Sequence, residues 1–135
     1  MSEACTFCRI VRNEEEASRI YEDENVVAFL DDRPVNEGHT LVIPKEHYEN
    51  IYEIPDEQIA YLFKIVKKVA QAIAEGEEAG GISIVQNNGK AAHQNIFHFH
   101  VHIIPRYEGQ ESRRPREIVS KGELDLVAAK IRKHL

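Results

Sequence analysis

The sequence predicts an α+β fold: a five-stranded antiparallel sheet with one long helix across it and a short C-terminal helix. Three observations predict this fold. Three short runs of β-forming residues follow one another near the N-terminus and are separated by tight turns. Residues 55–75 repeat with the period of a helix, and residues 96–104 alternate between two kinds of side chain. Strands joined by tight turns favour antiparallel pairing, and an amphipathic helix can cover one face of such a sheet.

The first part of the chain is predicted to form a short lead-in followed by three strands. Residues 7–11 suit either a helical or an extended lead-in. The strands occupy residues 19–22, 26–30 and 39–43, and turn residues or prolines separate them. Together they form an antiparallel meander.

The long helix is predicted from apolar residues three and four positions apart over residues 55–75. Pro55 stands at its first turn, and Gly76 stands where a left-handed cap would end it. The predicted buried side consists of Ile59, Leu62, Phe63, Val66, Val69, Ala70 and Ile73, and the wet side carries Lys64, Lys67 and Lys68.

The second part of the chain supplies two further strands and the last helix. The strands occupy residues 82–86 and 96–104, the latter stopped by Pro105, and the helix occupies residues 123–135. There is no repeat or linker, so residues 1–135 are predicted to form one domain, with a core at about 5–107 and a C-terminal extension at 108–135.

Composition narrows the class of function. The 135 residues include 17 Lys and Arg against 23 Asp and Glu, which gives a formal net charge of −6. This balance disfavours nucleic acid and anionic membranes as partners. No apolar run is long enough to span a bilayer, and the N-terminus lacks the blocks of a secretory signal. We therefore expect a cytoplasmic protein.

The two cysteines, Cys5 and Cys8, form one Cys-x-x-Cys pair. A disulfide is disfavoured in a reducing cytosol, and a thioredoxin-like site would require a preceding strand. The pair is therefore either half of a tetrahedral zinc site or two unrelated small residues.

Three histidines, His98, His100 and His102, alternate with apolar residues. In a strand the three rings would share one face, and Phe97, Phe99, Val101 and Ile103 would turn into the core. Three interpretations are open: a wet sheet face, a metal site, or nucleophilic and acid–base chemistry on a phosphate. The preceding loop offers uncharged groups that suit anionic oxygens, namely Asn87, Asn88, Gly89, Gln94 and Asn95.

The stretch from His98 to Ile104 resembles the His-x-His-x-His-x-x motif of the histidine triad superfamily of nucleotide hydrolases and transferases. The similarity covers nearly all of residues 5–107, because the segments at 28–31, 38–45, 87–89 and 94–95 also match in order and spacing. The resemblance implies cleavage at the α-phosphate of a nucleotide, usually an adenosine one.

The resemblance also assigns roles to the three histidines. His100 would attack phosphorus and form a nucleotidyl-histidine that water resolves, which is covalent catalysis without a required catalytic metal. His102 would sit by the phosphate and leaving group, and His98 would support the nucleophile. The segment Ile104-Pro105-Arg106 is similar to dinucleoside polyphosphate hydrolases, whereas the remainder is closer to small prokaryotic phosphoramidase-like proteins.

Matching to the same family implies a site for a purine nucleotide of the AMP type. Asp31 would accept hydrogen bonds from the ribose hydroxyls, and His39 would lie near the active site. The base would pack on Phe7, Ile10 and Phe29, and the phosphate side would be formed by Asn87, Gln94 and Asn95.

A distant branch of the superfamily, the galactose-1-phosphate uridylyltransferases, implies a structural zinc ion. Its pattern matches Cys5, Cys8, His47 and His98. Family members also form two-fold dimers, so a homodimer is expected. Two alternatives stay open: a metal-dependent enzyme that uses the histidine row as ligands, and a nucleotide-binding module with little turnover. Arg113, Arg114 and Arg116 form either a solvated loop or a contact with distal phosphates.

Overall fold

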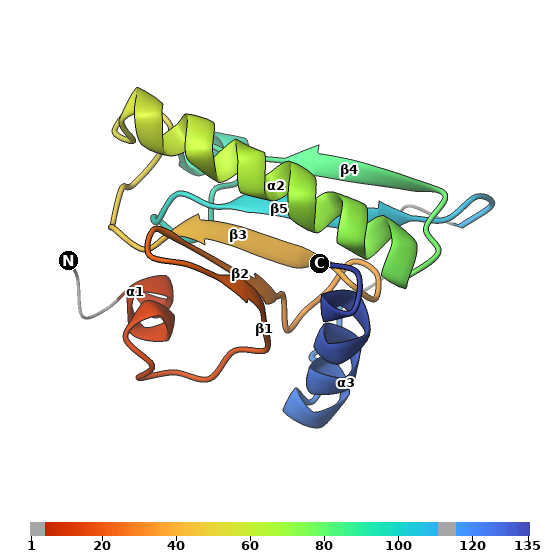
Figure 1. The fold of residues 1–135 in the computed structure, drawn as a ribbon. Helices are drawn as coiled ribbons and strands as arrows, with labels where there is room; N and C mark the ends of the chain where they lie inside the picture. Colours follow the sequence, from red (N-terminus) through yellow and green to blue (C-terminus); the bar gives the residue numbers. More distant parts are fainter. Residues whose placement is uncertain (1–4, 111–115) are drawn as a thin grey trace.

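The computed structural model describes residues 5–110 and 116–135 and contains the predicted α+β architecture. Five strands form one antiparallel sheet in the order β1-β2-β3-β5-β4. The long helix α2 runs across the sheet, and α3 lies beside the β1 end (Figure 1). The elements are α1 Thr6–Val11, β1 Arg19–Glu22, β2 Val26–Leu30, β3 Thr40–Pro44, α2 Asp56–Gly76, β4 Gly81–Val85, the 3₁₀ turn η1 Lys90–Ala92, β5 Val101–Arg106 and α3 Lys121–Arg132.

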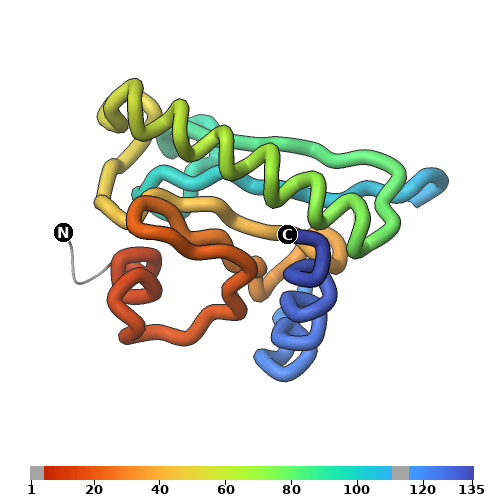
Figure 2. The backbone as a smooth tube through the Cα atoms, viewed as in Figure 1, coloured from red at the N-terminus to blue at the C-terminus, as the bar shows by residue number. Residues whose placement is uncertain are grey.

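The central strands β2 and β3 are covered on both faces and are buried along their whole length, whereas the edge strand β4 stays partly exposed. The larger apolar cluster includes Leu62 and Val69 of α2 and Ile131 of α3. The smaller cluster lies under α1 and includes Phe7 and Phe29. The tube in Figure 2 shows α1 (red) and α3 (blue) as two separate elements, with α2 (yellow to green) running across the sheet above both of them in this view. Among the described residues no helix is long and apolar enough to cross a membrane.

The end of α2 differs from the prediction at Gly76. This residue is still helical, and the positive φ that follows the helix belongs to Glu78. A Cβ atom on Gly76 would lie 3.3 Å from the Cα of Ile131. Gly76 is therefore required by the close approach of α3 rather than by a left-handed cap. Phe63, predicted on the buried side, is 38% exposed.

The predicted strand at 96–104 is wrong at both ends, since β5 begins at Val101 and continues through Pro105. At its start, the N–H of Phe99 donates to the carbonyl of Tyr48 instead of joining the ladder. At its end, Pro105 lies beyond the last residue that pairs with β3, because β3 begins opposite Ile103. The backbone N–H that proline lacks is therefore not needed for a hydrogen bond to β3. The Pro105 carbonyl accepts a hydrogen bond there from Asn36.

The predicted faces of this segment are confirmed except at Phe97. Phe99, Val101 and Ile103 are fully buried in the larger cluster. Phe97 is 42% exposed and lies in the bend at residues 96–98, before the chain becomes regularly extended.

Candidate functional site

The segment that precedes and enters β5 places His100 and His102 side by side, with ring centroids 5.0 Å apart. His100 is almost completely buried, and Phe7 of α1 packs edge-on against it at 5.1 Å. The Nδ1 atom of His100 lies 2.7 Å from the backbone carbonyl of His98. Since a carbonyl can only accept, Nδ1 carries the hydrogen and Nε2 keeps its lone pair. Burial lowers the pKa of His100, which favours the neutral imidazole with this nucleophilic nitrogen.

The hydrogen on His102 is fixed by a chain of two contacts. The N–H of Val35 donates to Nδ1 of His39 at 3.0 Å, so the neutral His39 ring carries its hydrogen on Nε2. That Nε2 lies 3.0 Å from Nδ1 of His102 and donates to it. The hydrogen of the neutral His102 ring therefore sits on Nε2. His102 is oriented as a hydrogen-bond donor through its other nitrogen.

The imidazole rings of His39 and His102 are both held in the neutral state. Burial lowers the pKa of His39 to about 3, and the neighbouring His102 and the Arg116 and Arg106 charges act in the same direction. Burial also lowers the pKa of His102 to about 4, with further contributions from His100 and Arg116. The donor–acceptor chain from Val35 to His102 is consequently stable at neutral and mildly acidic pH.

A cavity of about 1040 Å³ opens beside the two rings. Its apolar wall contains Phe7, Ile10 and Phe29, the residues predicted to contact a base. Asp31 lies at another part of the same wall, directly after β2, and its Oδ2 atom is 3.6 Å from Nε2 of His39. One cavity thus contains an apolar surface, a carboxylate and an imidazole nucleophile.

The predicted phosphate-side residues separate into two groups. Asn95 lines the cavity together with His100 and His102. Asn87 and Gln94 are not among the described residues that line it. The side chain of Gln94 is buried, donates to the carbonyls of Glu49 and Ile96, and accepts from the N–H of Gly89. Gln94 therefore braces the loop instead of offering a free donor.

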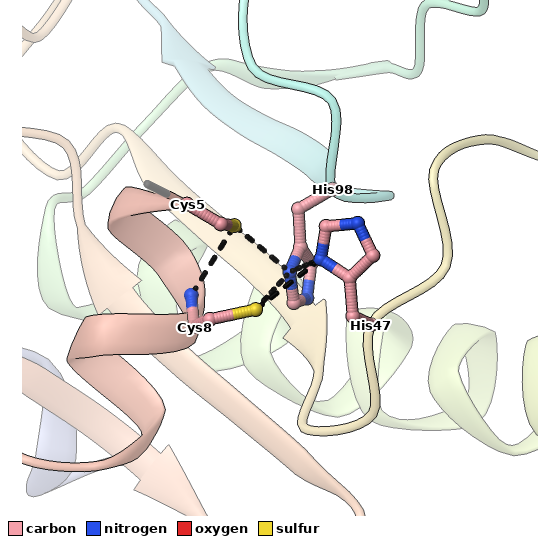
Figure 3. A group of neighbouring side chains, drawn as sticks. All are labelled: Cys5, Cys8, His47 and His98. Carbon is pink, nitrogen blue, oxygen red and sulfur yellow. Dashed lines mark hydrogen bonds between the residues drawn. The ribbon is translucent and has the colours of Figure 1, made fainter. Parts of the chain in front are cut away.

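The four predicted zinc ligands come together from three distant parts of the chain. Cys5 and Cys8 come from the start of α1, His47 follows β3, and His98 precedes β5; the side chains point toward one another (Figure 3). The distances are 3.5 Å from Cys5 Sγ to His98 Nδ1, 3.2 Å from Cys8 Sγ to His47 Nδ1, and 3.2 Å between the two Nδ1 atoms.

These distances suit a tetrahedral ion. Zinc–sulfur bonds of about 2.3 Å and zinc–nitrogen bonds of about 2.0 Å place ligand atoms roughly 3.3–3.8 Å apart. The Nε2 atom of His98 donates to the carbonyl of Pro44 at 2.8 Å, which leaves Nδ1 unprotonated and aimed at the cluster. This second contact is the one that metal-bound histidines commonly make. The residues present therefore fit zinc.

A second cluster, Asp31, His39 and His102, also has ligand atoms within 4.8 Å of one another, yet its hydrogen positions oppose a metal. An ion on Nε2 of His39 would require the hydrogen on Nδ1. That atom faces the N–H of Val35, and two donors would then oppose each other. The cluster is instead the donor–acceptor chain described above.

Residues 12–109 match the family model of the HIT domain. The chain belongs to the HIT family. It is 49% identical to Protein hit of Bacillus subtilis over 106 aligned residues, and the alignment covers 78% of this chain and 73% of that protein. It is 36% identical over 136 residues to Adenylylsulfatase HINT3 of Arabidopsis thaliana, with coverage of 97% and 69%.

Solved HIT structures share the fold. A hypothetical histidine triad nucleotide-binding protein from Sulfolobus tokodaii superposes with a TM-score of 0.90 at 44% identity, covering 96% of this chain and 91% of the other. A zinc-bound histidine triad family protein from Mycobacterium smegmatis superposes with a TM-score of 0.87 at 39% identity, covering 97% and 92%.

Two features of the site could not be assigned from the sequence. Arg116 lines the cavity and forms an ion pair with Asp31 at 2.8 Å. Arg113 and Arg114, considered with it above, lie outside the described residues. The contact between His39 and His102 joins residues 63 positions apart, and no local pattern indicates it.

Because His39 is buried, we expect the folded protein to lose stability in mild acid. Its pKa falls from 6.5 in the unfolded chain to about 3 in the folded one, so below pH 6.5 only the unfolded chain takes up the proton. This linkage lowers the free energy of unfolding by about 2 kcal/mol between pH 7 and pH 5. Urea unfolding of the wild type and His39→Asn at both pH values measures it. The variant should lose about 2 kcal/mol less than the wild type, and equal losses would contradict the prediction.

Proposed function

We propose that the protein is a nucleotide hydrolase or transferase that cleaves at the α-phosphate of adenosine phosphoramidates or dinucleoside polyphosphates. The observation that carries the proposal is the free Nε2 lone pair of His100, created by the bond from its Nδ1 to the His98 carbonyl, beside a cavity with an apolar wall and a carboxylate. Membership of the HIT family and the similarity to an adenylylsulfatase support the same class of reaction.

The proposed reaction has two displacements on one phosphorus. The Nε2 lone pair of His100 attacks the α-phosphorus, and the bond to the leaving group breaks with its electron pair. His102 donates a hydrogen bond from Nε2 to the phosphate or the leaving group. Water then attacks the nucleotidyl-histidine, the phosphorus–nitrogen bond breaks, and AMP leaves as the His100 lone pair is restored. The proton that the water releases passes to solvent, which supplies the proton that a departing amide takes up to leave as ammonia.

The nucleotide is positioned by the rest of the cavity. We assign the base to the apolar wall of Phe7, Ile10 and Phe29 and the ribose hydroxyls to the carboxylate of Asp31. Asn95 is placed on the phosphate side. An apolar slot with few polar groups around it is the usual form of such a pocket.

We infer that Cys5, Cys8, His47 and His98 hold a structural zinc ion. The zinc-bound relative and the unprotonated Nδ1 of His98 support this assignment. When bound, the ion supplies a fixed link between α1 and the segment before β5. His98 then acts through its backbone, because its carbonyl orients His100, and α1 carries Phe7 and Ile10 to the base pocket. A zinc site built from two cysteine thiolates also suits a reducing, cytoplasmic location.

A substrate panel tests the proposed function. Adenosine 5′-phosphoramidate, adenylyl sulfate and diadenosine tetraphosphate are incubated with the protein without added divalent metal, and AMP release is followed by chromatography. We expect turnover of at least one substrate. Tight binding of AMP without turnover of any would identify a binding module. Turnover that requires an added metal would favour the metal-dependent alternative.

We also propose that the protein forms a homodimer through β4 and the adjoining part of α2. In the described structure β4 pairs only with β5, which leaves its other edge free. Phe63, Ile84 and Phe97 are exposed by 38%, 45% and 42%. A free strand edge near exposed apolar side chains favours pairing with a second copy. Sedimentation should give a dimer for the wild type and a monomer for Ile84→Lys, and a monomeric wild type would contradict the proposal.

A further inference from the structure

The segment after residue 115 runs beside the start of the β2–β3 loop. The N–H of Val119 donates to the carbonyl of Asp32 at 2.8 Å. Arg116 donates from Nε to the carbonyl of Arg33 at 2.6 Å and from Nη2 to Oδ2 of Asp31 at 2.8 Å. This segment leads into α3 and lies outside residues 12–109, which match the HIT domain model. The contact is therefore an addition to the part of the chain that defines the family.

The hydrogen bonds of Asp31 leave room for a diol. Its Oδ1 accepts from the N–H of Arg33 at 2.9 Å, and its Oδ2 accepts from Arg116. A carboxylate can accept about four hydrogen bonds, so each oxygen keeps one position. The hydrogen of His39 is directed to His102 and does not fill them. Two acceptor positions, one on each oxygen, match the adjacent 2′ and 3′ hydroxyls of a ribose.

Arg116 also supplies the positive charge that a poorly exposed carboxylate needs. The Asp31 side chain is only 12% exposed. Burial raises its pKa, while the Arg33 N–H and the Arg116 charge oppose the rise and the adjacent Asp32 adds to it. Without Arg116 the carboxylate would lose a charged partner and the bond that fixes its plane.

We propose that Arg116 is a positioning residue that holds the Asp31 carboxylate in the orientation that accepts the two ribose hydroxyls. The proposal rests on the function proposed above, since it takes Asp31 as the ribose contact. It makes the C-terminal segment, rather than the shared HIT core alone, a determinant of the preference for ribonucleotides.

The test compares the binding of AMP and 2′,3′-dideoxy-AMP by calorimetry. In Arg116→Gln the Kd for AMP should rise about tenfold, whereas the Kd for the dideoxynucleotide should change less than about twofold. Arg116→Lys should recover part of the lost affinity for AMP, because lysine keeps the positive charge but lacks the planar guanidinium group. Lys130→Gln is the matched control. It breaks the ion pairs of Lys130 with Glu37 and Glu77, away from this cavity, and should leave both affinities unchanged.

Several results would overturn the inference. Tighter AMP binding by Arg116→Gln would show that Arg116 competes with the ribose. Equal weakening of both nucleotides would indicate a general charge effect, and the same loss in Lys130→Gln would indicate loosening of α3. Asp31→Asn distinguishes a failure of the proposed ribose contact at Asp31 from a failure of the proposed positioning role of Arg116. If it keeps the preference for AMP over the dideoxynucleotide, the ribose role of Asp31 fails; if only Arg116→Gln keeps it, this inference alone fails.

Discussion

Replacing His100 with alanine should lower kcat for an adenosine phosphoramidate by at least about a thousandfold, because the variant lacks the nitrogen lone pair that would form the covalent intermediate. The Kd for AMP should stay within about threefold, since base and ribose contacts lie on other residues. Steady-state kinetics and calorimetry on the same preparation measure the two quantities. The expected pattern is a loss in kcat without a comparable loss in ground-state binding.

The matched control for this variant is His93→Asn. His93 is exposed, belongs to the polar loop before the histidine segment, and has a positive φ that asparagine tolerates. This variant should keep the wild-type kcat. A His100→Ala protein with kcat within about tenfold of the wild type would exclude His100 as the nucleophile.

Replacing Cys8 with serine should abolish binding of the proposed zinc ion and lower the free energy of unfolding by at least about 3 kcal/mol. Cys8 is fully buried, and the cluster joins α1 to segments about 40 and 90 residues away. Metal analysis and urea unfolding measure the two effects. The wild type treated with a strong chelator should lose the same stability, and the chelator should have no further effect on the variant.

Loss of the metal should also lower kcat, because the backbone of His98 orients His100. A wild-type protein that contains no zinc after purification and reconstitution, or one whose stability and kcat do not respond to chelation, would contradict the structural role of the metal.

The local patterns in the sequence predicted the strands, the long helix and the opposite faces of the histidine segment. Alternation failed at Phe97, which lies in the bend before the strand, whereas Phe99 is buried as predicted although its N–H bonds to Tyr48 outside the ladder. Pro105 stays within β5 because its neighbour β3 has not yet begun at that point. Such end effects depend on the lengths of neighbouring strands, which a single segment does not contain.

In the candidate site, too, the sequence predicted some features and not others. The four residues proposed as zinc ligands were predicted from spacing and family resemblance, and the structure brings all four together. The hydrogen positions on His39, His98 and His100 depend on backbone groups of Val35, Pro44 and His98, and no residue type indicates these contacts. The Arg116–Asp31 pair joins positions 85 residues apart and depends on how α3 docks.

The proposed function requires that His100 forms a covalent bond to the α-phosphorus. The most direct test is to mix the protein briefly with adenosine 5′-phosphoramidate, quench it under conditions that preserve phosphorus–nitrogen bonds, and map the modified peptide by mass spectrometry. An adenylyl group on His100 that forms within one turnover and decays at the rate of AMP release is the predicted result. Turnover with no adduct, or with the adenylyl group on a different side chain, would contradict it.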